Sequence, residues 1–181
     1  MDLIEKARKV AKEQHGNKRR KYGDKELYYN HPFGVAERLK GFDEYRNNEN
    51  ILAAAYLHDT IEDTPMDYEE LKAQFNEKIA DLVRELTSDS SKYNSNKEDS
   101  KYLAKAKYLT DKINNISKEA RVIKLADREN NVSSLPECSH TFAHRYAKET
   151  EYILTHLAFE PNKSEKKLIA LIWEHITQYL D

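Results

Sequence analysis

The chain has 181 residues, a length that one hydrophobic core commonly serves, so we expect a single domain. Its 30 Lys and Arg residues against 32 Asp and Glu give a net charge of -2, which disfavours nucleic acid as a partner because no overall positive field is present. No apolar run approaches the roughly 20 residues that span a bilayer, so we expect no membrane association. The single cysteine, Cys138, and the lack of a signal-peptide pattern favour a cytoplasmic protein.

Only four glycines and four prolines interrupt long stretches with apolar residues at helical spacing, which predicts an all-α fold. The first helix is expected to have Asp2 as its N-cap and an apolar face between residues 3 and 11. The next helix is predicted to begin at Pro32 and to end near Gly41. Residues 51–61 are apolar nearly all round, which indicates a central buried helix.

The second half of the chain is also expected to be helical. Asp67 and Glu70 have the spacing of a capping box, and Asn76 is a point at which the following pattern can divide into two helices. The polar stretch 88–100 is predicted to be a loop, either a lid over a site or a plain solvated connection. Helical periodicity then returns at 102–113, 120–132, 142–157 and 168–180.

An apolar stripe lies in the last of these segments. Its members are Leu168, Ile172, Ile176 and Leu180. It is expected to pack against the body of the protein, with a dimer contact as the alternative.

Charged residues gather at the end of the buried helix, in "YLHDTIEDT", residues 56–64. On a helix, His58 would share a face with Glu62, and Asp59 with Asp63. Each of these residues alone is more often a surface or capping residue. Burying several charges together costs several kcal/mol each unless they are paired or bound to metal, and a His and Asp doublet suits a divalent cation.

Two other motifs strengthen the interpretation as a metal site. His31 lies at the start of a predicted helix in "YYNHPFGVAERL", and Asp127 ends an apolar run in "RVIKLADRENN". Together with His58 and Asp59, these residues would supply two imidazoles and two carboxylates, a set that fits Mn²⁺, Fe²⁺ or similar ions. Asn131 lies four residues after Asp127 and should face the same cavity.

The order of these motifs resembles the HD-domain phosphohydrolases. More narrowly, "HPFGVAERL", "HDTIEDT" and "IKLADRENN" are similar to the hydrolase domain of RelA/SpoT proteins and to the stand-alone small alarmone hydrolases, including the metazoan SpoT homologue. The segment "RYAKET", residues 145–150, is similar to a helix that follows the metal-binding aspartate in the bacterial enzymes. The likeness covers residues 1–157 of one expected domain, 1–181, and leaves 158–181 as a C-terminal helical segment.

The resemblance implies one Mn²⁺ per chain, held by His31, His58, Asp59 and Asp127, although other divalent ions also fit this donor set. It further implies that Glu62 and Asp63 position or deprotonate the attacking water. The implied reaction removes pyrophosphate from the 3′ position of (p)ppGpp, which makes a nucleotide the expected small-molecule partner. Because the chain ends before a synthetase domain, we expect degradation of this alarmone of the stringent response without its synthesis.

Other resemblances concern the substrate. An Arg at the position of Arg20 lies against guanine in the family, and the adjacent basic residue, here Lys21, lines the pocket; the alternative for "KRRK" is a solvated charged turn. Arg145 is either another substrate residue or part of a surface ion pair. The remaining histidines are expected to be structural or surface residues, with His15 nearest the site. They are His15, His140, His144, His156 and His175.

The chain departs from the bacterial pattern around the nucleotide rather than at the metal ligands. Glu129 and Asn130 replace Leu and His, Ser133 replaces Arg, and Leu27 replaces the proline before the pocket tyrosine. The alternatives are therefore an HD-domain phosphatase for NADPH, (p)ppApp or a nucleoside monophosphate, and a non-catalytic nucleotide sensor. A sensor would not need both Glu62 and Asp63, and this argues for an enzyme.

Overall fold

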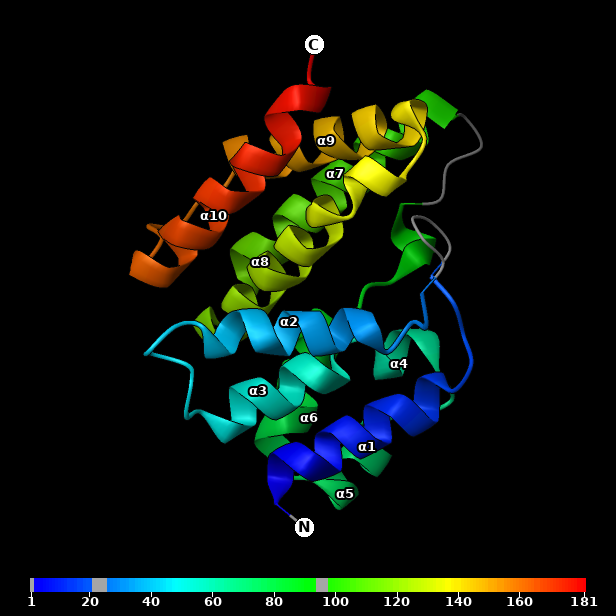
Figure 1. Ribbon diagram of the computed structural model, residues 1–181, viewed down its shortest axis with the longest axis vertical. Coiled ribbons are helices and arrows are strands. Elements are labelled where there is room, and N and C mark those ends of the chain that lie inside the picture. Colours follow the sequence, from blue (N-terminus) through cyan, green and yellow to red (C-terminus); the bar gives the residue numbers. More distant parts are fainter. Residues whose placement is uncertain (1, 21–25, 94–97) are drawn as a thin grey trace.

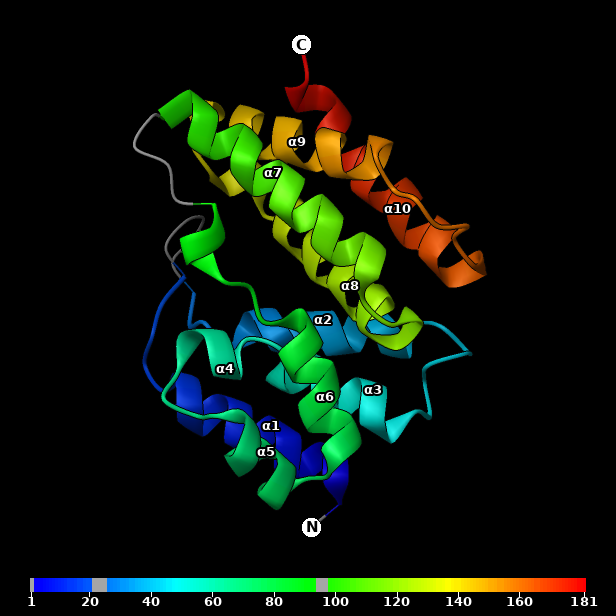
Figure 2. The ribbon, with the colours of Figure 1, turned by 180° about the vertical axis from the view of Figure 1, so that it is seen from behind.

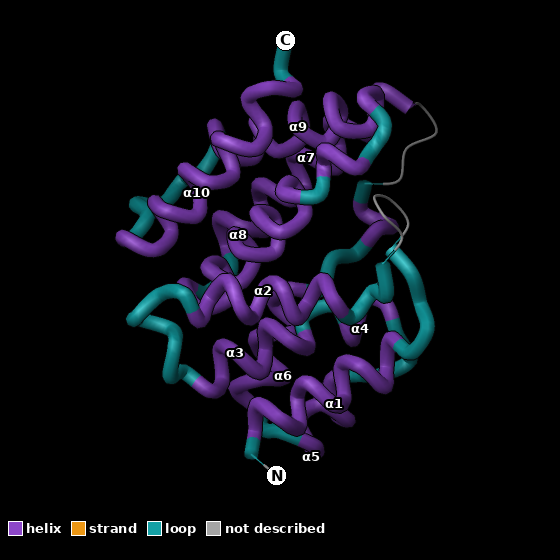
Figure 3. The backbone as a smooth tube through the Cα atoms, in the orientation of Figure 1, coloured by secondary structure: helices purple, strands orange, loops and turns teal. Residues whose placement is uncertain are grey.

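The computed structural model describes residues 2–20, 26–93 and 98–181. Within these ranges the chain is helical, with an isolated bridge between Arg19 and Leu27 and no strand, as Figure 3 shows. The helices in the first half are α1 (Leu3–His15), α2 (Asn30–Lys40), α3 (Glu49–Leu57), α4 (Thr60–Asp63), α5 (Tyr68–Gln74) and α6 (Glu77–Leu86). Those in the second half are the 3-10 turn η1 (Ser90–Lys92), α7 (Glu98–Asn115), α8 (Lys118–Ser133), η2 (Leu135–Glu137), α9 (His140–Thr155), α10 (Lys163–Ile176) and η3 (Thr177–Tyr179). The all-α prediction is confirmed.

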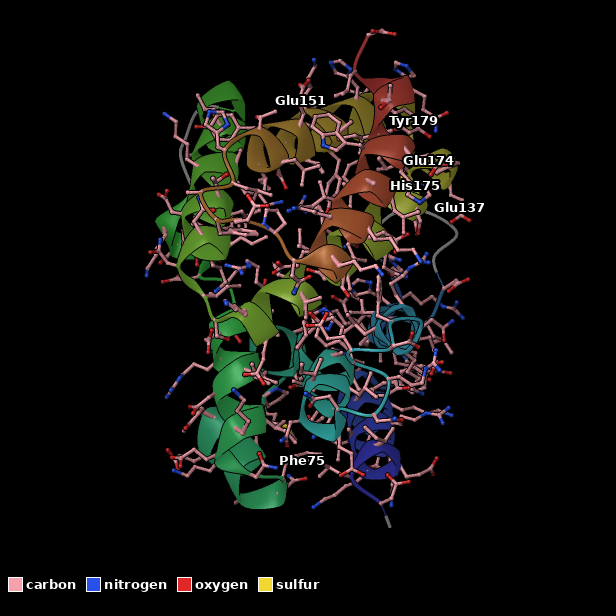
Figure 4. The ribbon with its side chains drawn as sticks, turned by 90° about the vertical axis from the view of Figure 1, so that its left-hand side faces the viewer. Phe75, Glu137, Glu151, Glu174, His175 and Tyr179 are labelled. Carbon is pink, nitrogen blue, oxygen red and sulfur yellow. The ribbon has the colours of Figure 1, made fainter. Side chains whose placement is uncertain are left out.

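The helices form two groups that meet at α2 and α8. In Figure 1, α1 to α6 occupy the lower part of the molecule and α7 to α10 the upper part. Helix α8 packs against α10, α9 and η2 above and against α2, α3 and α6 below, which makes it the central element. Figure 4 shows the same division from the side, with Phe75 at the lower end and Tyr179 on the upper group.

Local chemistry sets most of the helix ends. The Asp2 carboxylate accepts hydrogen bonds from the backbone N–H groups of Ile4 and Glu5, which starts α1. Asp67 and Glu70 form the expected capping box of α5. Asn76 does divide the following segment, because its side chain accepts from the Ile79 N–H at the start of α6.

The central buried helix is shorter than predicted. Helix α3 is fully buried from Ile51 to Leu57 but ends at Leu57, and α4 begins only at Thr60. His58 and Asp59 therefore lie in the turn between two helices, not on one continuous helix. The Thr60 hydroxyl donates to the Leu57 carbonyl at 2.7 Å, which satisfies a backbone group that the break would leave unpaired.

Two other boundaries differ from expectation. Helix α2 begins at Asn30, two residues before Pro32. The predicted loop 88–100 contains the turn η1 and the first residues of α7, while residues 94–97 of it lie outside the described part of the chain.

The apolar stripe at the C-terminus packs within the molecule. Leu168, Ile172 and Ile176 are completely buried, and α10 lies against α8 and α9. Leu180 is only partly buried, after the helix has changed into η3. None of the described helices is long and apolar enough to cross a membrane.

Candidate metal centre and adjoining cavity

His58 lies directly after the buried helix α3, and a hydrogen bond determines which of its ring nitrogens carries a proton. Its side chain is 1% exposed, and its Nδ1 lies 2.8 Å from the Ala55 carbonyl oxygen. A carbonyl can only accept, so Nδ1 carries a proton, and in the neutral form of the ring Nε2 presents a lone pair. Among the described residues Nε2 has no hydrogen-bond partner, although Asp59 Oδ1 lies 3.2 Å away and Asp127 Oδ1 3.8 Å away. A buried lone pair that faces carboxylate oxygens is the arrangement that a cation would complete.

His31 approaches the same point from the start of α2. Its Nδ1 lies 2.7 Å from Asn130 Oδ1, and its Nε2 lies 3.1 Å from Asp127 Oδ1 and 3.7 Å from Asp59 Oδ2. The contact with Asn130 orients the ring in the way that outer hydrogen bonds orient metal-binding histidines. It depends on Gly34, because a Cβ at that position would lie 2.5 Å from Asn130 Nδ2.

The ligand atoms of His31, His58 and Asp127 all lie within 4.8 Å of one another, and each of these residues is buried. Donors about 2.1 Å from a shared ion lie at most about 4.2 Å apart. Asp127 Oδ1 meets this limit with both imidazoles, at 3.1 Å from His31 Nε2 and 3.8 Å from His58 Nε2. Asp59 borders the group through its contacts with both imidazoles. The structure thus brings together the four residues predicted as ligands; we call them the His/Asp cluster.

Outer partners fix both carboxylates of the cluster. The Tyr28 hydroxyl donates to Asp59 Oδ2 at 2.7 Å. Asn131 donates to Asp127 Oδ1 at 2.6 Å, as its spacing predicted, and Lys124 donates to Asp127 Oδ2 at 2.9 Å. Burial opposes ionisation of Asp127, but the Lys124 ammonium and the two imidazoles hold the pKa of this carboxyl well below its ordinary value.

Glu62 and Asp63 lie next to the cluster on the short helix α4, and both are exposed. Glu62 Oε2 accepts a hydrogen bond of 2.8 Å from the backbone N–H of Ser88, and Asp63 Oδ2 lies 2.9 Å from Lys18 Nζ. Partial burial of the carboxyl group raises the pKa of Glu62, and the nearby charges of Asp59 and Asp63 act in the same direction. A carboxylate of raised basicity beside the cluster is suited to accept a proton from water.

A cavity of about 290 Å³ adjoins the cluster. Its lining includes Arg20, Tyr28, Lys105, Asn131, Phe142 and Tyr146. Two of these residues, Tyr28 and Asn131, also bind carboxylates of the cluster, so the cavity and the cluster share a wall. The Phe142 and Tyr146 rings stack with centroids 5.8 Å apart, which gives the cavity an aromatic side.

The cavity is also basic. Arg20 donates hydrogen bonds to Asn131 Oδ1 at 2.8 Å and to Ser134 Oγ at 3.3 Å. Its guanidinium therefore lies against the wall that the cavity shares with the cluster. Lys105 Nζ lies 3.1 Å from Glu149 Oε2, and Glu149 also accepts from Arg128 at 2.9 Å. The aromatic rings suit a nucleotide base, and the guanidinium of Arg20 and the ammonium of Lys105 suit its phosphates.

The remaining predicted substrate residues have different outcomes. Lys21 lies outside the described residues. Arg145 is exposed on α9 and is not among the described residues that line the cavity. His15 lies close to the site: it is buried, and its ring centroid lies 4.8 Å from that of Tyr28, which binds Asp59.

Three residues of the site were not predicted from the sequence: Lys124, Lys105 and Ser88. Lys124 could have been found, because it precedes Asp127 by three residues on a predicted helix. Lys105 and Ser88 had no such signal, since only the tertiary fold places α7 beside α9 and residue 88 beside α4.

The family model described as HD domain matches residues 7–160. The chain belongs to the HD-domain family. A protein of Aquifex aeolicus named guanosine-3′,5′-bis(diphosphate) 3′-pyrophosphohydrolase is 36% identical over 164 residues, which cover 86% of this HD-domain chain and 21% of the relative. A Xenopus tropicalis protein of the same name, with the suffix MESH1, is 32% identical over 137 residues, 76% of this chain and 72% of the relative. The chain therefore spans about a fifth of the Aquifex protein.

Solved structures show the same fold. The structure described as a metazoan orthologue of SpoT that hydrolyses ppGpp superposes with a TM-score of 0.78 at 23% identity, covering 96% of this chain and 95% of that one. A Listeria monocytogenes crystal structure superposes with a TM-score of 0.62 at 21% identity, covering 86% of this chain and 98% of that one. Nearly all of the chain thus has a structural counterpart in the first structure.

Proposed function

We propose that this HD-domain protein is a metal-dependent (p)ppGpp 3′-pyrophosphohydrolase that releases GDP or GTP. The observation that carries the proposal is the shared wall between the His/Asp cluster and a basic, aromatic cavity. A nucleotide held in the cavity would place a phosphate group at the cluster. The names of the Aquifex and Xenopus relatives support ppGpp as the substrate.

The cluster residues His31, His58, Asp59 and Asp127 are the proposed ligands of one Mn²⁺ ion per chain. Two imidazoles and two carboxylates are a mixed donor set that suits this ion among other divalent cations. When bound, such an ion lowers the pKa of its water and offsets negative charge on the phosphoryl group. The unpartnered Nε2 of His58 supports this assignment.

Glu62 and Asp63 are the proposed water-handling pair. Glu62, with its raised pKa, would accept the proton of the attacking water, while the Ser88 N–H binds Oε2 and fixes the direction of the carboxylate. Asp63, fixed by Lys18, would orient that water. The water oxygen then bonds to the proximal phosphorus, the bond from this phosphorus to the ribose 3′ oxygen breaks, and that oxygen takes up a proton as pyrophosphate leaves.

The proposed substrate contacts follow from the lining of the cavity. Arg20 can stack against the base with its guanidinium plane, and Asn131 joins the base side of the cavity to Asp127. Contacts from Lys21 and Arg145 remain predictions. We further propose that residues 1–181 act as one domain, and that the protein works in the reducing cytoplasm, which its single cysteine suits.

Turnover of ppGpp beside NADPH, (p)ppApp and GMP, with Mn²⁺ present and products separated by ion exchange, tests the proposal. We expect pyrophosphate and GDP from ppGpp well above turnover of the other nucleotides. Glu62→Gln and Asp63→Asn should each lower turnover at least about 100-fold and keep nucleotide binding. Asp43→Asn is the matched control, because Asp43 is 91% exposed and forms an ion pair with Arg46, three residues away on the surface. Turnover of another nucleotide alone would reject the substrate, and full activity of both variants would reject the proposed roles.

A further inference from the structure

The connection between α6 and η1 touches the proposed water-handling pair. Figure 2 shows this connection as it passes beside α4 on its way toward α7. Its residues Thr87, Ser88 and Asp89, which we call the 87–89 strap, include the Ser88 N–H that binds Glu62 Oε2 at 2.8 Å. Glu62 is exposed as a whole, so this hydrogen bond is a main restraint on the direction of its carboxylate.

Helix α7 holds the strap on both sides of that hydrogen bond. Lys112 Nζ donates to the Thr87 carbonyl at 2.5 Å, and the Tyr108 hydroxyl accepts from the Asp89 N–H at 2.9 Å. The Tyr108 ring is itself packed against Tyr93, with centroids 5.2 Å apart. Three consecutive strap residues are therefore fixed in turn by Lys112, Glu62 and Tyr108.

We propose that Lys112 and Tyr108 are positioning residues that act on Glu62 through the 87–89 strap. The inference rests on the proposed function, in which Glu62 accepts a proton from water. A base must lie within hydrogen-bond reach of that proton, and a displacement of about 1 Å can cost 100-fold in rate. Without its two anchors on α7, the strap would no longer hold the Ser88 N–H at one place.

The charge of Lys112 supports a role beyond packing. The groups that face it are Lys124 on α8, Glu62 on α4, Lys92 on η1 and Glu85 on α6. Partial burial and the nearby Lys124 ammonium lower the pKa of Lys112 to about 8. The Glu62 and Glu85 carboxylates act in the opposite direction and favour the charged form. A partly buried ammonium of this kind is stabilised by its hydrogen bond to the Thr87 carbonyl of the strap.

The same face of α7 also reaches the nucleotide cavity. Lys105, Tyr108 and Lys112 are three and four residues apart, a spacing that places them along one side of a helix. Lys105 lines the cavity, while the other two hold the strap. The single helix α7 thus contacts both the nucleotide cavity and the 87–89 strap that binds Glu62.

The test uses the full chain with saturating Mn²⁺ and a series of ppGpp concentrations, and compares Lys112→Met, Lys112→Arg and Tyr108→Phe. We expect Lys112→Met to lower kcat roughly 10- to 100-fold and to change KM less than about twofold. Lys112→Arg keeps a donor for the Thr87 carbonyl and should restore most of kcat, and Tyr108→Phe should lower kcat because the Asp89 N–H loses its acceptor. Lys107→Met is the matched control: Lys107 is exposed on the same helix, and kcat should not change.

A double variant separates this inference from the proposed function. In a Glu62→Gln background, Lys112→Met should produce no further loss, because the group that it positions has already lost its role. If wild-type protein hydrolyses ppGpp and Glu62→Gln abolishes turnover, yet Lys112→Met and Tyr108→Phe both keep full kcat, the inference fails alone. Failure of wild-type turnover would instead reject the proposed function. In that case, hydrogen exchange of the Ser88 amide decides the inference: we expect faster exchange in Lys112→Met, and unchanged exchange would overturn it.

Discussion

The Arg38 and Glu129 pair gives a quantitative test of how α2 and α8 are held together. Arg38 Nε and Nη2 each lie 2.8 Å from one oxygen of Glu129. The Glu129 side chain is 1% exposed, whereas that of Arg38 is 42% exposed. His175 on α10, labelled in Figure 4, is a further neighbour, with Nε2 3.5 Å from Glu129 Oε1.

This asymmetry in exposure predicts unequal costs for the two single variants. Arg38→Met leaves a buried carboxylate without its main partner, a change that costs about 3–5 kcal/mol in the free energy of unfolding. Glu129→Met leaves a guanidinium that can turn toward water, so only its charged hydrogen bonds are lost, about 1.5–3 kcal/mol. The double variant should be more stable than Arg38→Met alone, because two apolar side chains leave no unpaired charge.

Urea denaturation of the four proteins at one metal concentration gives the three free-energy differences. Since both residues lie in one contact, the cycle should show clear non-additivity. The reasoning would be refuted if Arg38→Met cost no more than Glu129→Met, or if the double variant cost the sum of the two.

Other consequences concern the metal, its outer partners and Lys112. Removal of the metal by a chelator should lower the free energy of unfolding by about 2.7 kcal/mol, compared with protein in Mn²⁺ at 100 times its dissociation constant. Calorimetry should find no such difference in Asp127→Asn. Gly34→Ala should push Asn130 away from the imidazole that it orients and weaken Mn²⁺ binding about 10- to 100-fold; equal affinity by titration would contradict this. With a pKa of about 8, about half of the Lys112 amine is neutral at pH 8 and can react with an acetylating reagent. Mass spectrometry should therefore find faster acetylation of Lys112 than of the exposed Lys107, and a slower rate would count against the lowered pKa.

Local chemistry explains why much of the fold and the cluster could be predicted. The caps at Asp2, Asp67 and Asn76 act through residues at most three positions away, so the sequence alone contains them. Asp127 and Asn131 share a helix, and their contact follows from its period.

The features that were missed depend on tertiary structure or on small backbone changes. The break between α3 and α4 has no Gly or Pro to mark it, and the apolar pattern continues through Ile61. Glu129 departs from the bacterial pattern, and its role became clear only when the fold placed Arg38 beside it. The support of Glu62 by Ser88 likewise joins residues 26 positions apart.

The most direct test of the account is turnover as a function of bound metal. Metal-free protein would be titrated with Mn²⁺ while bound ion is counted by electron paramagnetic resonance and pyrophosphate release from ppGpp is measured in the same samples. The account predicts that both quantities rise together and saturate at one ion per chain, and that His58→Ala loses both. Turnover in protein without bound metal, or one bound ion per chain without release of pyrophosphate, would contradict it.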